Sequence, residues 1–180
     1  AYPITPSSEI MEYMVKYAPA EGGVMLQTED EISACTMAIG AAHAGARAFT
    51  ATAGPGLSLM AEAIGLAEMT ETPLVVIDTQ RGGPSTGLPT KHEQSDLMAA
   101  IYNTHGDTAK IVISPSSIEE SFYDTFEAFN LAEEYQCPVI VLSDLQLSLG
   151  KQSVTSLDYG KLQVRRGKLV KDGLPEIKSP

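Results

Sequence analysis

Residues 74–79 read LVVIDT, a run in which apolar, mostly β-branched residues follow one another without polar alternation. Short runs of related composition occur at 24–27 (VMLQ), 48–52 (AFTAT), 110–113 (KIVI) and 139–143 (VIVLS), and all but the first are almost wholly apolar. Continuous apolarity is typical of strands in a parallel sheet that helices cover on both faces. We therefore predict five short buried strands.

Helical patterns separate these runs. We predict helices at 6–18, 30–45, 57–70, 93–102 and 116–135. In the last of these, apolar residues recur at three- and four-residue spacing and form one stripe, which we interpret as core: Ile118, Phe122, Phe126, Phe129 and Ala132. The alternation of strands and helices predicts an α/β fold, a doubly wound and mostly parallel sheet with helices on both faces.

Charge divides the chain into two parts. The 180 residues have a net charge of −11. Residues 1–150 carry five basic and 20 acidic residues, a net charge of −15, whereas residues 151–180 carry seven and three, a net charge of +4. Because residues 1–150 are this acidic, they repel nucleic-acid phosphates and anionic membrane surfaces. We therefore expect neither a nucleic acid nor a membrane as a partner.

The glycine-rich, basic composition of residues 151–180 is typical of a connector. We predict one α/β domain at 1–150 and a connector at 151–180, with a short strand near 162–164, that leads to further domains absent from this chain. The sequence begins at Ala1 rather than Met, and we expect it to be a piece of a longer protein.

The two cysteines, Cys35 and Cys137, both lie in apolar stretches and are predicted to be buried free thiols. Free thiols indicate a reducing, cytoplasmic compartment. Two distant cysteines cannot hold a zinc ion or an iron–sulfur cluster, so no metal site is predicted on this chain. The sequence has no signal peptide and no apolar run of about 18 residues.

In doubly wound folds, ligands bind at the carboxyl ends of the strands. Four segments are predicted to meet at that edge: 1–10 (AYPITPSSEI), 27–33 (QTEDEIS), 50–56 (TATAGPG) and 80–96 (QRGGPSTGLPTKHEQSD). Each can also be a plain strand-to-helix loop. The glycine-rich turn TAGPG at 52–56 matches neither GxGxxG nor GxxxxGK(S/T), the two common phosphate-binding patterns. Close packing of its backbone against a flat ligand or a neighbouring chain is the favoured interpretation.

Two of these segments carry residues with alternative roles. Thr5 is predicted to cap the first helix, with Pro6 in its first turn, and its hydroxyl can also face an anionic ligand. The acidic run Glu29, Asp30 and Glu31 either complements the helix dipole as a solvated face or provides a partly buried carboxylate for a heterocyclic nitrogen.

Arg81 and Lys91 are two of the five basic residues among the first 150, and both lie in the loop at the predicted ligand edge. The planar guanidinium of an arginine binds both oxygens of a carboxylate, so Arg81 is a candidate carboxylate ligand. A surface salt bridge is the alternative.

Taken together, YPITPSSE, EDEISA, FTATAGPGLSLM, ETPLVV and QRGGPSTGLPTKHEQSD occur here in one order. Over residues 1 to about 145, this order closely resembles the α subunit of 2-oxoacid:ferredoxin oxidoreductases, the 2-oxoglutarate type in particular. More distantly, the chain is similar to the pyrimidine-binding domain of thiamine diphosphate enzymes in general.

The resemblance implies oxidative decarboxylation of a 2-oxoacid with coenzyme A, which yields an acyl-CoA, carbon dioxide and reduced ferredoxin. It implies that Glu31, or failing that Glu29, bonds the aminopyrimidine ring nitrogen of thiamine diphosphate. The Pro3–Ile4 backbone would lie near that ring, Thr5 would bond the substrate and Arg81 would hold the 1-carboxylate. Lys91 would meet a distal carboxylate.

The family's Gly-Asp-Gly motif for Mg²⁺ and diphosphate is missing, because the nearest match, GDT at 106–108, departs from it. The resemblance therefore implies a partner β subunit that carries the Mg²⁺, the diphosphate contacts and the iron–sulfur cluster. We expect the small-residue helices at 31–45 and 57–69 to face that partner.

Two alternatives stay open at this stage. One is a non-redox thiamine diphosphate decarboxylase or carboligase subunit, and the other is a non-catalytic binding module with a flavodoxin-like sheet. Within the leading hypothesis, the sequence favours 2-oxoglutarate but does not separate it from pyruvate or branched 2-oxoacids.

Overall fold

The computed structural model describes residues 1–170 and 173. Its centre is a four-stranded sheet in which every neighbouring pair is parallel, in the order β1-β2-β4-β3. The strands are β1 (Phe49–Thr52), β2 (Leu74–Gln80), β3 (Ile111–Ile113) and β4 (Pro138–Asp144). Parallel neighbours need crossover connections, and helices supply them, so the predicted α/β fold is confirmed.

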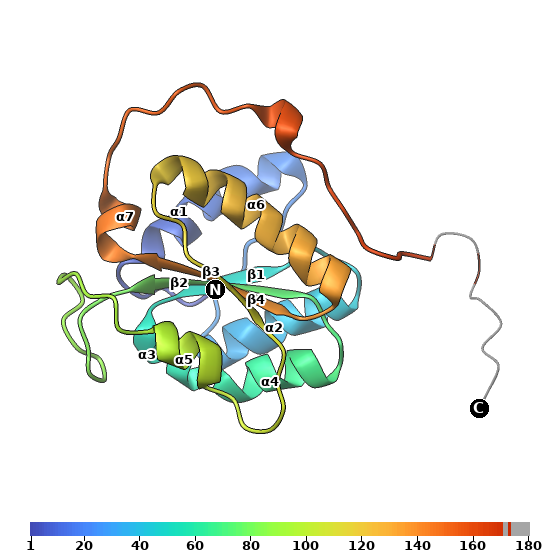
Figure 1. The fold of residues 1–180 in the computed structure, drawn as a ribbon, viewed down its shortest axis with the longest axis horizontal. Coiled ribbons are helices and arrows are strands. Elements are labelled where there is room, and N and C mark those ends of the chain that lie inside the picture. Colours follow the sequence, from blue (N-terminus) through green and yellow to red (C-terminus); the bar gives the residue numbers. More distant parts are fainter. Residues whose placement is uncertain (171–172, 174–180) are drawn as a thin grey trace.

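Helices cover both faces of this sheet (Figure 1). One face carries α1 (Ser8–Tyr17) and α6 (Ile118–Tyr135), with α7 (Leu145–Leu149) following β4. The other face carries α2 (Glu31–His43), α3 (Gly54–Leu59), α4 (Ala61–Met69) and α5 (Leu97–Tyr102). Two short 3₁₀ turns, at Ala18–Glu21 and Tyr159–Lys161, complete the described elements.

The apolar strands are explained by two hydrophobic cores, one on each face of the sheet. Val75 packs into the core under α6, and its neighbour Val76 packs into the core with α2 and α4. Both side chains are buried. Because successive residues of a strand point to opposite faces, a sheet covered on both sides needs apolar residues at consecutive positions.

Helix α6 begins directly after Ser117, a serine in the N-cap position, which serine favours. The Ser117 hydroxyl accepts a hydrogen bond from the Glu120 N–H at 3.1 Å, and the Glu120 carboxylate accepts one from the Ser116 N–H at 2.7 Å. These bonds satisfy amides that the first turn leaves without partners. On the inner side of the helix, Phe129 meets Phe49 of β1 edge to face, with the ring centroids 5.9 Å apart.

Three predicted elements differ from the structure. Residues 24–27 form no strand, and Val24 is 81% exposed, so this run lacks the burial that the other four have. The predicted helix at 57–70 begins earlier, at Gly54, and is divided at Met60 into α3 and α4. Residues 162–164 are extended but pair with no strand among the described residues.

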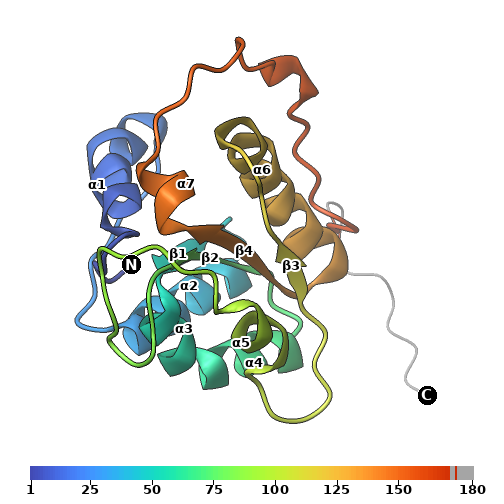
Figure 2. The same cartoon turned by 60° about the vertical axis from the view of Figure 1, so that its left-hand side comes forward.

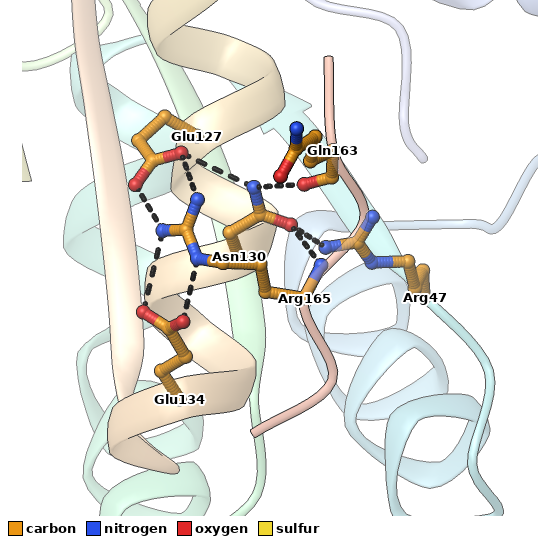
Figure 3. A network of polar contacts seen from close by, with 6 residues as sticks. All are labelled: Arg47, Glu127, Asn130, Glu134, Gln163 and Arg165. Atoms are coloured by element: carbon orange, nitrogen blue, oxygen red, sulfur yellow. Dashed lines mark hydrogen bonds and ion pairs between the residues drawn. The ribbon is translucent and has the colours of Figure 1, made fainter. Parts of the chain in front are cut away.

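Residues 163–166 lie along α6 instead of leaving the domain directly (Figure 3). The Arg165 guanidinium forms ion pairs with Glu127 and Glu134 of that helix. Buried Asn130 bonds the connector backbone twice: its amide donates to the Gln163 carbonyl and its oxygen accepts from the Arg165 N–H, each at 3.0 Å. The same oxygen accepts from Arg47 at 2.6 Å. This middle stretch of the predicted connector is therefore docked on the domain.

Candidate active site

The structure gives the three residues of the acidic run different environments. Asp30 is the N-cap of α2, and its carboxylate accepts from the Ser33 N–H at 2.7 Å, a bond that lowers the pKa of Asp30. Glu29 is exposed. Glu31, the first residue of the helix, is 6% exposed. Of these three residues, only Glu31 therefore offers a buried carboxylate.

Close packing against Glu31 explains the glycine-rich turn after β1. A Cβ atom placed on Gly56 would lie 2.0 Å from the Thr52 hydroxyl oxygen and 2.7 Å from Cγ of Glu31. Both distances are far below any real contact, so only glycine fits there. The turn therefore packs its backbone against the Glu31 side chain of the same chain, a contact that the sequence analysis did not predict, whereas its packing against a ligand or a neighbouring chain stays a prediction.

The N-terminal segment reaches the same edge, but Thr5 does not cap a helix. Helix α1 begins at Ser8, its N-cap position is Ser7, and the Ser7 hydroxyl donates back to the Ile4 carbonyl at 2.8 Å. The predicted cap was wrong because the chain makes a tight turn at 4–7, closed by the Ser7 N–H on the same carbonyl, before the helix starts. The Thr5 side chain is exposed.

Arg81 follows the carboxyl end of β2 and is 5% exposed. Its two terminal nitrogens donate to the carbonyls of Thr5 and Thr86, each at 2.6 Å, and its Nε–H has no partner. Among the described residues, no carboxylate forms an ion pair with it. The surface salt bridge that the sequence allowed is therefore not what Arg81 makes here. Sequence and structure agree in bringing Thr5 and Arg81 together.

Arg81 also lines a cavity of about 370 Å³ between α3 and the loop of residues 81–96. Gly54 and Pro55 form one wall, and Gly82, Gly83 and Asp96 contribute to the other. Figure 2 shows this loop, in green, beside the N-terminus and close to α3. Lys91 is exposed on the same loop, and no contact brings its side chain to the Arg81 guanidinium.

The loop of residues 81–96 is anchored on β4 as well. Asp144 accepts a hydrogen bond from the Gln94 amide at 2.6 Å and lies 3.3 Å from Nε2 of His92. It also accepts from the Leu147 N–H at 2.8 Å and so caps α7. Sequence reasoning missed this anchor because Asp144 lies 50 residues from Gln94 along the chain.

Asp78 and Asp96 are a second feature that the sequence analysis missed. Asp78 lies within β2 with no exposed surface, and neither of its carboxyl oxygens has a hydrogen-bond donor. Burial, followed by the nearby Asp96 carboxylate, raises the pKa of Asp78 well above its usual range. The available signal was a single charged residue inside the apolar run at 74–79.

The described residues hold no cluster of three or more His, Cys, Asp or Glu side chains arranged for a metal ion. Cys35 and Cys137 are free and buried, and burial raises the pKa of the Cys35 thiol to about 12. No helix within 1–170 has the length and apolarity needed to cross a bilayer.

Relatives of the chain indicate the family to which it belongs. The chain is 50% identical to the 2-oxoglutarate synthase subunit KorA of Methanothermobacter thermautotrophicus, over 98% of the chain and 50% of that protein. It is 45% identical to the 2-oxoglutarate oxidoreductase subunit KorA of Mycobacterium tuberculosis, over 97% of the chain and 27% of that protein. The chain thus spans half or less of these relatives.

A solved structure agrees with them. The 2-oxoglutarate:ferredoxin oxidoreductase from Magnetococcus marinus, with 2-oxoglutarate, coenzyme A and succinyl-CoA bound, matches 93% of this chain and 29% of its own, with a TM-score of 0.90 and 48% identity. Residues 1–175 match the family described as "Pyruvate flavodoxin/ferredoxin oxidoreductase, thiamine diP-bdg". The resemblance predicted from the motifs is confirmed, and the chain belongs to this thiamine-diphosphate-binding family of ferredoxin oxidoreductases.

Proposed function

We propose that this chain is the pyrimidine-binding part of the α subunit of a 2-oxoacid:ferredoxin oxidoreductase. The enzyme would decarboxylate a 2-oxoacid, with 2-oxoglutarate favoured, and use coenzyme A to form an acyl-CoA, carbon dioxide and reduced ferredoxin. The relatives and the solved structure support the reaction and the substrate. The observation that carries the proposal is the buried Glu31 carboxylate packed against the Gly56 backbone.

The residues at the sheet edge fit thiamine diphosphate. Glu31 has no hydrogen-bond donor among the described residues, so its carboxylate is available to a ring nitrogen. Because Gly56 has no Cβ atom, the Glu31 side chain has room against the backbone of this turn. The Pro3–Ile4 backbone belongs to the N-terminal segment, which the hydrogen bond from Arg81 to the Thr5 carbonyl connects to the same edge. Bound here, the cofactor would supply a nucleophilic ring carbon for the 2-oxoacid and an electron sink for the decarboxylation.

Glu31 holds a proton between its carboxylate and the aminopyrimidine ring nitrogen. Burial excludes most water from this contact, and an interaction between a charge and a polar group is stronger where water is excluded. Glu29 cannot serve in this way because its side chain is in solvent.

Arg81 binds the 1-carboxylate of the substrate. A buried guanidinium without a counter-ion is costly, and an incoming carboxylate removes that cost by pairing with it. The bond from Arg81 to the Thr5 carbonyl holds both residues at the same place, so the Thr5 hydroxyl can bond the substrate next to Arg81. Lys91, at the exposed end of the loop, is the candidate for a distal carboxylate.

A β subunit completes the site in this proposal. It would carry the Mg²⁺ ion, the diphosphate contacts and the iron–sulfur cluster, and ferredoxin would accept the electrons. Exposed apolar side chains on α2 and α4 support the expected interface: Ile32, Met37, Leu66 and Met69. The free thiols Cys35 and Cys137 support a reducing, cytoplasmic compartment.

The test is a substrate panel on the assembled enzyme. The full-length α chain is co-expressed with its β subunit, and reduction of a viologen is followed with 2-oxoglutarate, pyruvate or a branched 2-oxoacid, with and without coenzyme A. We expect reduction that requires coenzyme A and is fastest with 2-oxoglutarate. Release of carbon dioxide without viologen reduction would instead identify a non-redox decarboxylase.

A further inference from the structure

Gln80 is the last residue of β2, directly before Arg81, and its side chain is buried. Its amide is bonded through both the nitrogen and the oxygen. Nε2 donates to the Ser143 carbonyl of β4 at 3.1 Å, and Oε1 accepts from the Asp96 N–H at 2.9 Å. A buried amide bonded in this way is fixed in one orientation, because turning it would leave a donor and an acceptor without partners.

The bond to Asp96 closes the loop of residues 81–96 into a ring. The loop leaves β2 after Gln80 and returns to Asp96, the N-cap residue of α5, so one side chain connects its two ends. Loops of this length without helices or strands are ordinarily mobile, and a bond between the two ends restricts the conformations open to them. We therefore expect the loop to be held in the shape that the structure shows.

The neighbouring strand holds the returning end of the same loop. Asp144, the last residue of β4, faces Gln80 in the register of the sheet and accepts a hydrogen bond from the Gln94 amide at 2.6 Å. Within the loop, the Gly82 N–H donates to the Lys91 carbonyl at 2.8 Å. The loop is thus fixed both from the ends of two adjacent parallel strands and from inside.

The closed loop matters because of the charge that it carries. The Arg81 guanidinium is buried and forms no ion pair with a carboxylate among the described residues. A buried charge without a counter-ion is unfavourable and moves toward water unless other contacts hold it. One of the two carbonyls that hold it belongs to Thr86 of the same loop, at 2.6 Å. The position of the guanidinium therefore depends on the loop staying closed.

Gln80 also connects the two walls of the cavity that contains Arg81. Gly54, Arg81 and Asp96 line this cavity. A Cβ atom on Gly54 would lie 2.8 Å from Oδ2 of Asp96, so the end of the loop packs directly on the turn that starts α3. Because Gln80 is the chain neighbour of Arg81 and bonds the Asp96 backbone, its side chain fixes where these two lining residues lie relative to each other.

We propose that Gln80 is a positioning residue of the 2-oxoacid site: its amide closes the loop of residues 81–96 and so holds the Arg81 guanidinium ready for the 1-carboxylate of the substrate. The inference rests on the proposed function, because the carboxylate that Arg81 binds is the proposed one. Gln80 acts through Arg81 rather than on the reacting atoms. A site that is ordered before its ligand arrives spends less of the binding free energy on ordering.

The experiment uses the full-length α chain in complex with its β subunit and compares Gln80→Met with Asn130→Leu. Each variant replaces a buried amide by an apolar side chain of similar size, and Asn130 bonds the connector instead of the loop. In Gln80→Met only part of the population keeps Arg81 in place, so KM for 2-oxoglutarate should rise about tenfold, with kcat changing less than about threefold. Asn130→Leu should lower the thermal stability of the complex and leave KM within about twofold.

A double-mutant cycle with Arg81→Ala separates positioning from a general loss of structure. Once the guanidinium is gone, Gln80 has nothing left to position, so adding Gln80→Met to Arg81→Ala should change KM by less than about twofold. An equal effect of Gln80→Met in both backgrounds, or no effect on KM in either, would overturn the inference. If Gln80→Met does not fold, Gln94→Met removes the bond to Asp144 and takes its place in the cycle, with an expected rise of about threefold.

Hydrogen exchange of the complex without substrate tests the closed loop independently of activity. The amides of residues 81–96 should exchange faster in Gln80→Met than in either the unmodified complex or Asn130→Leu. Equal exchange of the loop in all three complexes would overturn the inference. Faster exchange in a complex that is inactive toward every 2-oxoacid would overturn the proposed function and leave Gln80 as the anchor of the loop.

Discussion

At the scale of single residues, Arg81 has one observed role, in holding the loop, and one proposed role, in binding the substrate, and the two can be separated. Its terminal nitrogens hold the Thr5 and Thr86 carbonyls, and its charge is buried without a carboxylate among the described residues. Arg81→Ala should raise KM for the 2-oxoacid about tenfold to 100-fold, because the substrate loses its buried counter-ion. Steady-state kinetics of the α–β complex measure this change.

Arg81→Lys is the matched control for the same position. Lysine keeps the positive charge but cannot donate to two carbonyls and a carboxylate in one plane, so KM should rise less than in Arg81→Ala. If Arg81→Ala leaves KM unchanged while lowering the thermal stability of the complex, Arg81 is only a brace for the loop.

The acidic run at 29–31 shows how far sequence patterns reach at this scale. The sequence predicts a helix start with a carboxylate at the ligand edge, and both are present. It does not decide between Glu29 and Glu31, because the burial of Glu31 depends on Gly56, which lies 25 residues away in the chain. The buried Asp78 carboxyl also escapes prediction, because only the folded chain shows that no donor among the described residues reaches its oxygens.

At the scale of elements, burial on two faces decides which apolar runs become strands. The runs at 48–52, 74–79, 110–113 and 139–143 lie near β1 to β4, and α6 and the α2–α5 layer cover them. The run at 24–27 has a related local composition, but it follows two glycines and three of its four residues, Val24, Leu26 and Gln27, are exposed. A local apolar pattern therefore predicts which segments are able to form a strand. Burial in the folded protein distinguishes the four segments that do.

The docking of the connector on α6 gives a prediction at the same scale. Asn130 is fully buried and bonds Gln163, Arg165 and Arg47, whereas the Arg165 guanidinium and its glutamates are partly exposed. Asn130→Ala should lower the free energy of unfolding by about 1–3 kcal/mol, because it leaves buried groups without partners.

Arg165→Ala should cost less than Asn130→Ala, because solvent weakens an exposed ion pair. Denaturant unfolding of the full-length chain measures both variants, and the loss in Arg165→Ala should shrink at high salt. A larger loss in Arg165→Ala than in Asn130→Ala would show that the ion pairs, not Asn130, hold the connector.

At the scale of the whole molecule, the charge asymmetry of the sequence has a structural use. The acidic residues of α6 face basic residues of the connector: Arg165 pairs with Glu127 and Glu134, and Arg166 pairs with Glu133. Composition alone distinguished the two parts of the chain. It did not predict their contact, because ion pairs between distant segments leave no periodic signal. The division into a domain at 1–150 and a connector at 151–180 stays a prediction.

The proposed function assigns only part of an active site to this domain. At its sheet edge Arg81 bonds the Thr5 carbonyl, and the buried Glu31 packs against Gly56 in the turn after β1. Within the described residues the domain provides no metal-binding cluster. The central claim is that this edge provides the pyrimidine and substrate half of a shared site, with Glu31 as its proton-holding group.

The most direct test of that claim is the rate of 2-oxoglutarate-dependent viologen reduction by the α–β complex carrying Glu31→Gln, with Glu29→Gln as the matched control. Glutamine keeps the shape of Glu31 but cannot exchange a proton with the ring nitrogen. We predict a loss of about 100-fold or more for Glu31→Gln and a change within about twofold for Glu29→Gln. A Glu31→Gln complex that keeps near-normal rates would contradict the account.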